Sequence, residues 1–119
     1  MAQVLIADDA MFMRALVKKV LVSGGHEVIG EAENGRRAVE LYTSLKPDVV
    51  LMDITMPEFD GLQALEAIIQ QDPQAQIIMC TALGQQDKVK SALMIGARDY
   101  VVKPFDAGKL LDAIARVLN

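Results

Sequence analysis

The stretch of sequence that decides the fold reads Asp48-Val49-Val50-Leu51-Met52-Asp53. Its four consecutive apolar residues are typical of a strand that is buried on both faces of a parallel sheet. Residues 4–7, 76–80 and 99–102 form similar, largely apolar stretches. Residues 26–32 are more polar, which favours a strand at the edge of the same sheet. The chain is therefore expected to form a sheet of five strands.

Amphipathic segments separate these strands, and their apolar residues recur at the spacing of one helix face. Five helices are predicted in this way, with Asn34 and Asp106 as N-caps and Gly24 and Gly96 as stops. The five apolar faces consist of Met13, Leu16, Val17, Val20 and Leu21; Ala38, Leu41, Tyr42 and Leu45; Leu62, Leu65, Ile68 and Ile69; Val89, Ala92, Leu93 and Ile95; and Leu110, Leu111, Ile114, Val117 and Leu118.

A strand followed by a helix, five times over, predicts an α/β fold of the flavodoxin-like, doubly wound (βα)5 type. Right-handed crossovers place helices on both faces of the five-stranded parallel sheet. The commonest strand order at this size is 2-1-3-4-5, whereas a closed barrel of such units would need eight of them. A chain of 119 residues fits a single domain, residues 1–119, and leaves no room for an additional output domain.

The composition argues against several classes of function. The net charge is -4 and no basic patch is visible in the sequence, so nucleic acid is not an expected partner. The apolar runs are far shorter than the ~20 residues that span a bilayer, and no signal sequence is recognisable. We therefore expect no membrane insertion and a cytoplasmic location. Cys80 is the only cysteine and follows an apolar run, which favours a buried structural thiol.

Polar residues follow four of the predicted strands at the edge where ligands bind in open α/β sheets. Asp8 and Asp9 follow the first strand, Asp53 ends the third, and Thr81 and Lys103 follow the fourth and fifth. Clustered carboxylates repel one another and need a cation, and ligation by oxygen alone suits Mg²⁺. A carboxylate beside this metal can attack a phosphoryl group, whose oxygens a lysine and a threonine can then bind.

Each of these residues also has an ordinary structural interpretation. An aspartate after a strand is most often a turn or cap residue, and Asp9 in particular could cap the first helix. Lys103 could be a solvated turn lysine, and Thr81 could bond to the local backbone. Their joint occurrence at one edge of the sheet nevertheless favours the chemical interpretation.

Two enzyme or carrier classes remain as alternatives. A small Mg²⁺-dependent phosphatase of the haloacid dehalogenase type also uses an aspartate nucleophile after a strand, but it carries a second aspartate where this chain has Thr55. An FMN carrier of the same fold needs a phosphate-binding loop after the first strand, where this chain has Asp8 and Asp9. Turnover of p-nitrophenyl phosphate and a yellow colour on purification would test these alternatives.

The sequence resembles the receiver domain of bacterial two-component response regulators over essentially its whole length. The resemblance rests on Val4-Leu5-Ile6-Ala7-Asp8-Asp9, Val50-Leu51-Met52-Asp53-Ile54-Thr55-Met56-Pro57, Asp60-Gly61, Thr81-Ala82 and Val101-Val102-Lys103-Pro104-Phe105. It implies that Asp53 accepts a phosphoryl group. It also implies that Asp9 binds Mg²⁺ directly, that Asp8 binds it mostly through water, and that the backbone carbonyl of Thr55 is a further ligand.

The same resemblance implies a switch and its partners. Thr81 and Tyr100 look like the switch pair, and the Lys103-Pro104 peptide is usually cis in this family. Val89 and Leu93, one helical turn apart, would line a partner-facing surface beside Tyr100, although ordinary core packing explains them equally well. Such a protein is a switch rather than an enzyme, since it catalyses only its own phosphorylation and dephosphorylation.

A narrower resemblance is to the stand-alone chemotaxis regulators of Gram-positive and thermophilic bacteria. It rests on Ala7-Asp8-Asp9-Ala10-Met11-Phe12-Met13-Arg14 and on Thr81-Ala82-Leu83-Gly84-Gln85-Gln86. It implies a CheA-like histidine kinase, a flagellar motor switch protein and a phosphatase as partners, and a monomeric state. The isolated receiver of a different regulator, with an output other than chemotaxis, remains an alternative.

Overall fold

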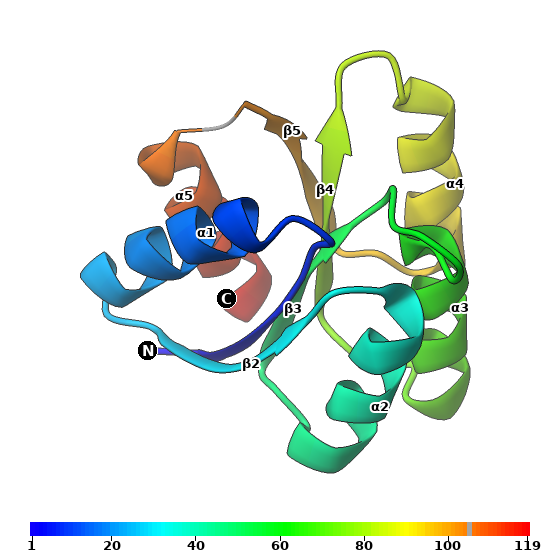
Figure 1. Ribbon diagram of the computed structural model, residues 1–119, viewed down its shortest axis with the longest axis horizontal. Coiled ribbons are helices and arrows are strands. Elements are labelled where there is room, and N and C mark those ends of the chain that lie inside the picture. The colour runs from blue at the N-terminus through cyan, green and yellow to red at the C-terminus, as the bar shows by residue number, and fades with distance from the viewer. Residues whose placement is uncertain (105) are drawn as a thin grey trace.

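The computed structural model describes residues 1–104 and 106–119, so Phe105 of the last quoted motif lies outside the described residues. Over these residues, strands and helices alternate along the chain (Figure 1). The strands are β1 (Gln3–Ala7), β2 (Glu27–Ala32), β3 (Val49–Asp53), β4 (Ile77–Ala82) and β5 (Asp99–Lys103). The helices are α1 (Met11–Ser23), α2 (Gly35–Leu45), α3 (Gly61–Gln71), α4 (Gln86–Ile95) and α5 (Ala107–Leu118). The predicted (βα)5 pattern is confirmed.

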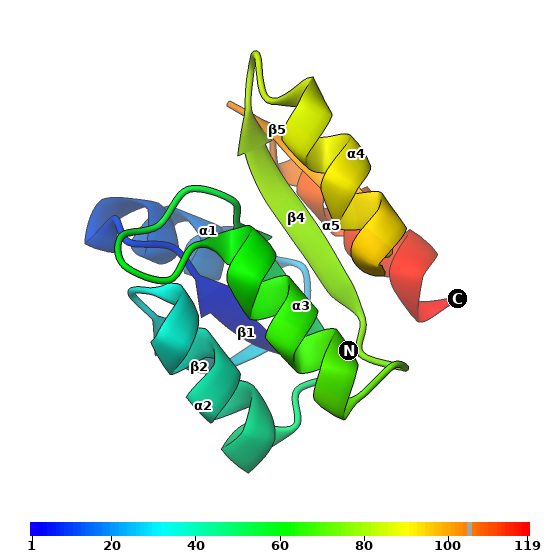
Figure 2. The ribbon, with the colours of Figure 1, turned by 90° about the vertical axis from the view of Figure 1, so that its right-hand side faces the viewer.

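The five strands form one parallel sheet in the order β2-β1-β3-β4-β5, as the sequence predicts. Helices α1 and α5 cover one face of this sheet, and α2, α3 and α4 cover the other (Figures 1 and 2). The polar strand β2 lies at an edge and the apolar strand β3 lies in the centre. No helix formed by the described residues is both long enough and apolar enough to cross a membrane.

Side chains that point alternately to the two faces of the sheet divide the interior into two cores. In β3, Val50 and Met52 pack into the core beneath α2, α3 and α4, while Val49 and Leu51 pack into the core beneath α1 and α5. All four are at most 2% exposed. Because successive strand residues point to opposite faces, only an unbroken apolar run can fill both cores. The decisive stretch of the sequence is therefore the part of the chain on which both layers of helices pack.

The predicted N-caps of α2 and α5 are confirmed. The Asn34 side chain accepts a hydrogen bond from the Arg37 amide at 2.8 Å, and the Asp106 side chain accepts one from the Lys109 amide, also at 2.8 Å. Each bond satisfies one of the amides that a helix start leaves without an intrahelical partner.

The alternative role of Asp9 as a helix cap is wrong. The N-cap of α1 is Ala10, which makes no capping hydrogen bond through its side chain. It is Asp8 that bonds to this turn, because its Oδ1 accepts a hydrogen bond from the Ala10 amide at 2.9 Å. The Asp9 side chain is exposed and lies at the carboxyl end of β1.

Two strands extend further than their apolar residues indicate. Thr81 pairs with Val102, and Ala82 with Lys103, so β4 and β5 continue past the predicted ends at residues 80 and 102. Strand pairing uses backbone groups, so it can continue beyond the last apolar side chain. The consequence for the site is that Thr81 and Lys103 are held on the sheet itself rather than on loops.

Candidate functional site

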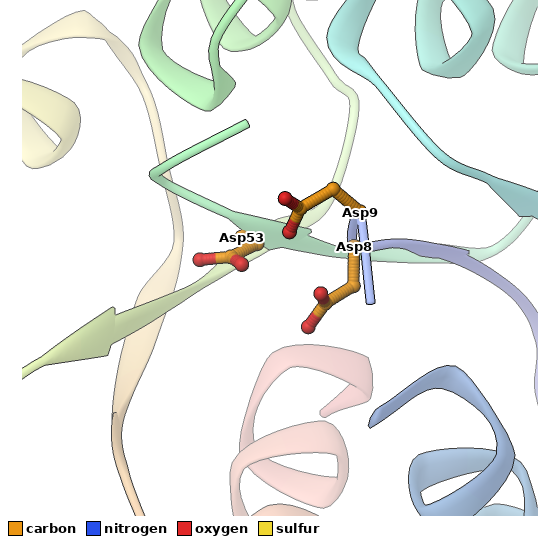
Figure 3. A group of neighbouring side chains, drawn as sticks. All are labelled: Asp8, Asp9 and Asp53. Atoms are coloured by element: carbon orange, nitrogen blue, oxygen red, sulfur yellow. The ribbon is translucent and has the colours of Figure 1, made fainter. Parts of the chain in front are cut away.

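Three carboxylates meet at the carboxyl end of the sheet. Asp8 and Asp9 follow β1, and Asp53 is the last residue of the neighbouring strand β3. One oxygen from each side chain lies within 4.8 Å of one from each of the others (Figure 3). Asp8 is 5% exposed and Asp53 is 9% exposed, whereas Asp9 faces solvent. The predicted cluster is therefore present, with two buried members and one open to incoming ligands.

Lys103 joins the two buried carboxylates. Its Nζ lies 3.0 Å from Asp8 Oδ2 and 3.1 Å from Asp53 Oδ2, and it donates a hydrogen bond to each. One ammonium against three carboxylates leaves a formal charge of -2 in the cluster. Oxygen donors with excess negative charge suit a hard divalent cation such as Mg²⁺, so the residues present fit the metal that the sequence predicts.

Burial and the Asp8 charge oppose Lys103 and the Thr55 amide in setting the pKa of Asp53. Burial raises the pKa of its carboxyl group, and the neighbouring Asp8 charge raises it further. The Lys103 ammonium and the amide of Thr55, which donates to Asp53 Oδ1 at 3.3 Å, lower this pKa, but the net shift is upward. A carboxylate whose charged form is poorly solvated is a good candidate for a nucleophile that reacts once a cation arrives.

The same environment acts on Lys103. Burial disfavours its charged form, but the hydrogen bond to Asp8 and the charges of Asp53 and Asp8 outweigh burial, so the pKa of Lys103 is raised. The lysine is therefore a permanent cation at neutral pH. It offers ammonium protons to whatever oxygen atoms enter the site.

Replacing Asp53 by asparagine is expected to change how stability depends on pH. The raised pKa of Asp53 means that the folded protein holds its proton more tightly than the unfolded chain does. Wild-type stability should therefore fall as the pH rises from the ordinary value of 3.8 through the raised one. Asp53→Asn lacks this fall, so its free energy of unfolding should rise relative to that of wild type as the pH increases. Urea melts of both proteins in EDTA, from about pH 4 to about pH 7, would measure it; a difference that stays constant with pH would contradict the assignment.

Thr81 and Thr55 flank the cluster on neighbouring chain segments. Thr81 is 1% exposed near the end of β4, and its hydroxyl lies 3.0 Å from Oε1 of Gln85. Thr55 follows β3 two residues after Asp53, and its side chain is exposed. Both threonines lie at the carboxyl end of the sheet, which the sequence predicts for Thr81 from its position after the fourth strand.

Val89, Leu93 and Tyr100 line one groove together with Thr81. Leu93 is 43% exposed and Tyr100 is 42% exposed, so both present part of their side chains to solvent. Val89 is 9% exposed and also belongs to the core beneath α4. The core packing of Val89 is therefore confirmed, and the residue also lines the groove, while its partner-facing role stays a prediction.

Sequence reasoning missed two residues that hold this site. Arg14 Nη1 donates to the backbone carbonyl of Asp8 at 2.7 Å, and its Nε donates to Glu31 at 3.2 Å. Gln85 connects the ends of β3 and β4 through three hydrogen bonds. Nothing in their spacing distinguishes them from solvated polar residues, so only the folded structure reveals them.

The arrangement agrees with what the comparisons with known proteins find. Residues 4–115 match the model of the response regulator receiver domain. The chain belongs to this family. Receiver domains are phosphorylation-activated switches of two-component signalling, and they bind Mg²⁺ at an acidic pocket to which the carboxylate cluster corresponds. Membership of this family decides against the phosphatase and the FMN carrier.

Several relatives of this receiver domain are chemotaxis proteins. It is 56% identical to the chemotaxis protein CheY of Bacillus subtilis, over 98% of both chains. It is 51% identical to CheY of Thermotoga maritima, over 97% of this chain and 96% of the relative. Among solved structures, it resembles a chain in the CheX-CheY-BeF3-Mg²⁺ complex of Borrelia burgdorferi, with a TM-score of 0.94 and 37% identity, over 98% of this chain and 89% of that chain.

Proposed function

We propose that this receiver domain takes a phosphoryl group from a CheA-like histidine kinase onto Asp53, with the help of Mg²⁺, and that it regulates flagellar rotation in chemotaxis. The observation that carries the proposal is the lysine bridge. Lys103 holds the buried Asp8 and Asp53 side by side, and the exposed Asp9 completes a cluster with a net negative charge. The high identity to chemotaxis relatives over nearly full length supports the chemotaxis output over that of another regulator.

Phosphoryl transfer to Asp53 is a balanced displacement. A carboxylate oxygen of Asp53 forms a bond to phosphorus, while the bond from phosphorus to a nitrogen of the kinase histidine breaks. The electron pair of the broken bond stays on that nitrogen, and a proton already carried by the other ring nitrogen lets the imidazole leave as a neutral ring. The product is an acyl phosphate on Asp53. Hydrolysis by water returns the carboxylate and inorganic phosphate, which makes the switch reversible.

The residues around Asp53 have separate roles in this proposal. Asp9 would ligate Mg²⁺ directly, Asp8 mostly through water, and Asp53 and the backbone carbonyl of Thr55 would complete the protein ligands. When bound, the metal supplies positive charge beside the phosphoryl oxygens. Lys103 would exchange part of its bonding to the carboxylates for a phosphoryl oxygen, which positions this group after transfer.

The output of the switch would pass through the groove beside α4. Once Thr81 donates its hydroxyl to a phosphoryl oxygen, Tyr100 can enter the space near it, and the groove that Val89 and Leu93 line changes shape. Apolar residues that are exposed in a groove are typical anchors for a partner segment. The partners in this proposal are the flagellar motor switch protein and a phosphatase, and the protein acts in the cytoplasm as a monomer.

Binding of Mg²⁺ is expected to stabilise the wild-type protein through Asp9. At a hundredfold excess over the dissociation constant, the metal should raise the free energy of unfolding by about 2.7 kcal/mol. In Asp9→Asn this gain should be much smaller, because a direct ligand is lost. In EDTA the variant should be slightly more stable than wild type, since one of three neighbouring negative charges is removed. Urea melts of both proteins with Mg²⁺ and with EDTA measure all four values.

Labelling by acetyl phosphate under the same conditions tests the function itself. Wild type should take up a phosphoryl group with Mg²⁺ and not with EDTA, and Asp9→Asn should be labelled slowly even with Mg²⁺. Equal labelling rates for wild type in Mg²⁺ and in EDTA would rule out the metal-assisted transfer.

A further inference from the structure

The side chain of Gln85 joins the chain segments that follow β3 and β4. Its Oε1 accepts hydrogen bonds from the Thr81 hydroxyl at 3.0 Å and from the Ala82 amide at 2.8 Å. Its Nε2 donates to the Thr55 hydroxyl at 3.0 Å. One amide therefore uses both of its ends to connect the proposed switch threonine with a segment that begins beside Asp53. We call these three hydrogen bonds the Gln85 latch.

We propose that Gln85 is a positioning residue whose latch keeps the Thr81 hydroxyl occupied in the unphosphorylated protein and must open before the switch can operate. The inference rests on the proposed function, because it takes Asp53 as the site of phosphorylation. It adds a residue that sets the balance between the two states of the switch. The hydrogen bonds described for the Gln85 side chain involve neither the three carboxylates of the cluster nor Lys103.

The number of protons on the Thr81 hydroxyl makes the two states exclusive. The Thr81 hydroxyl lies 3.0 Å from Gln85 Oε1 and 3.2 Å from the backbone carbonyl oxygen of Ala82, so Gln85 offers the nearer acceptor. A threonine hydroxyl carries one proton, so it cannot donate to these acceptors and to a phosphoryl oxygen at the same time. Since Thr81 is 1% exposed, its hydroxyl needs a protein partner in either state. A charged phosphoryl oxygen is a stronger acceptor than a neutral amide oxygen. After phosphorylation of Asp53, the Thr81 hydroxyl is therefore expected to donate its hydrogen bond to a phosphoryl oxygen instead of to Gln85.

The position of Gln85 at the start of α4 supports a role other than helix capping. Gln85 is the N-cap residue of α4, but its side chain makes no capping hydrogen bond. Glutamine is not among the residues that serve well at this position, where serine, threonine, aspartate and asparagine are preferred. The amide is instead bound in the latch. The start of α4 therefore lacks a side-chain cap, and the latch bonds tie it to the sheet.

The segment before Gln85 can change conformation when the latch opens. Gly84 has φ +90°, and a Cβ built there would meet nothing within 4 Å. The adjoining Leu83 is 77% exposed. A glycine with open space around it can adopt other backbone conformations at little cost. Opening of the latch would thus free the start of α4, the helix that carries Val89 and Leu93 of the groove.

The variant Gln85→Ser separates the latch from stability. Serine is too short to reach Thr55 and Thr81 together, yet it is a good N-cap for α4. If Gln85 were merely structural, its loss would destabilise the protein and leave the switch unchanged. The proposal predicts that acetyl phosphate labels the variant about fivefold faster than wild type, the factor that one hydrogen bond represents, whether or not the free energy of unfolding changes.

The conformational effect is measured without any phosphoryl group. In unphosphorylated Gln85→Ser, the NMR signals of the Thr81 methyl group and the Tyr100 ring should move part of the way toward their positions in wild type saturated with beryllium fluoride and Mg²⁺. Thr55→Val, which removes only the acceptor for Nε2, should move them less in the same direction. The double variant should move them no further than Gln85→Ser does, because both substitutions open one latch.

An exposed glutamine outside the latch provides the control. Gln70→Ala removes an exposed amide from α3 and should change neither the spectra nor the rate. Two outcomes for Gln85→Ser would overturn the proposal. One is NMR signals of Thr81 and Tyr100 that overlay those of wild type, and the other is a labelling rate at or below the wild-type rate. If wild type itself takes up no phosphoryl group, the proposed function fails instead, so the two failures are distinguishable.

Discussion

Lys103→Ala is expected to lower the free energy of unfolding by about 3 kcal/mol in EDTA near neutral pH, because it leaves two buried carboxylates without their shared cation. In the wild type, Lys103 Nζ lies 3.0 Å from Asp8 and 3.1 Å from Asp53. Mg²⁺ should restore most of the loss, since it brings positive charge to the same oxygen atoms. Urea melts with and without the metal measure both effects.

A matched control removes a lysine that makes no ion pair among the described residues. Lys88 is exposed on α4, and Lys88→Ala should change stability by less than about 0.5 kcal/mol in either condition. A deficit in Lys103→Ala that is equally large in EDTA and in Mg²⁺ would mean that the loss comes from packing of the lysine stem rather than from charge. The Lys103→Ala protein should still bind the metal but transmit phosphorylation poorly to its partner.

Gly61→Ala is expected to destabilise the protein by about 3 kcal/mol and to displace Asp53. A Cβ at this position would overlap the backbone carbonyl oxygen of Asp53 and lie 2.8 Å from Cα of Ile54. The Gly61 amide also donates to the Ile54 carbonyl at 2.8 Å, so the close approach of α3 to the end of β3 is fixed from both sides. Neither backbone segment can yield without moving the site.

Gly108→Ala is the natural comparison for this substitution. Gly108 also lies in the first turn of its helix, but a Cβ there would meet only the Asp106 side chain, at the ordinary distance of 3.4 Å. This variant should gain up to about 1 kcal/mol from helix propensity. If Gly61→Ala were as stable as Gly108→Ala, the close packing of α3 against the end of β3 would not constrain the site.

The sequence is sufficient to predict the sheet and the cluster because both follow from strand ends. Apolar runs locate the strands, and the doubly wound topology brings the residues that follow β1 and β3 to one edge. The proximity of Asp8, Asp9 and Asp53 is a consequence of this topology. The predicted strand ends are less accurate, because backbone pairing carries β4 through Thr81 and β5 through Lys103.

The sequence is not sufficient to predict which side chains hold the site in place. Gln85 reaches Thr55, thirty residues away in the chain, through a loop whose path depends on Gly84. Arg14 reaches the Asp8 carbonyl from α1 because the rotation of that helix against the sheet directs it there. Such contacts depend on loop geometry and rotamers, which residue types alone do not determine. The exclusion of Asp9 as a cap likewise needed the backbone of residues 8–10.

The central claim, that Asp53 accepts the phosphoryl group, is tested most directly by intact-protein mass spectrometry after incubation with acetyl phosphate and Mg²⁺. Wild type should gain the mass of one phosphoryl group, and Asp53→Asn should gain none, while urea melts confirm that the variant is folded. Full labelling of folded Asp53→Asn, or no labelling of wild type in Mg²⁺, would contradict the account.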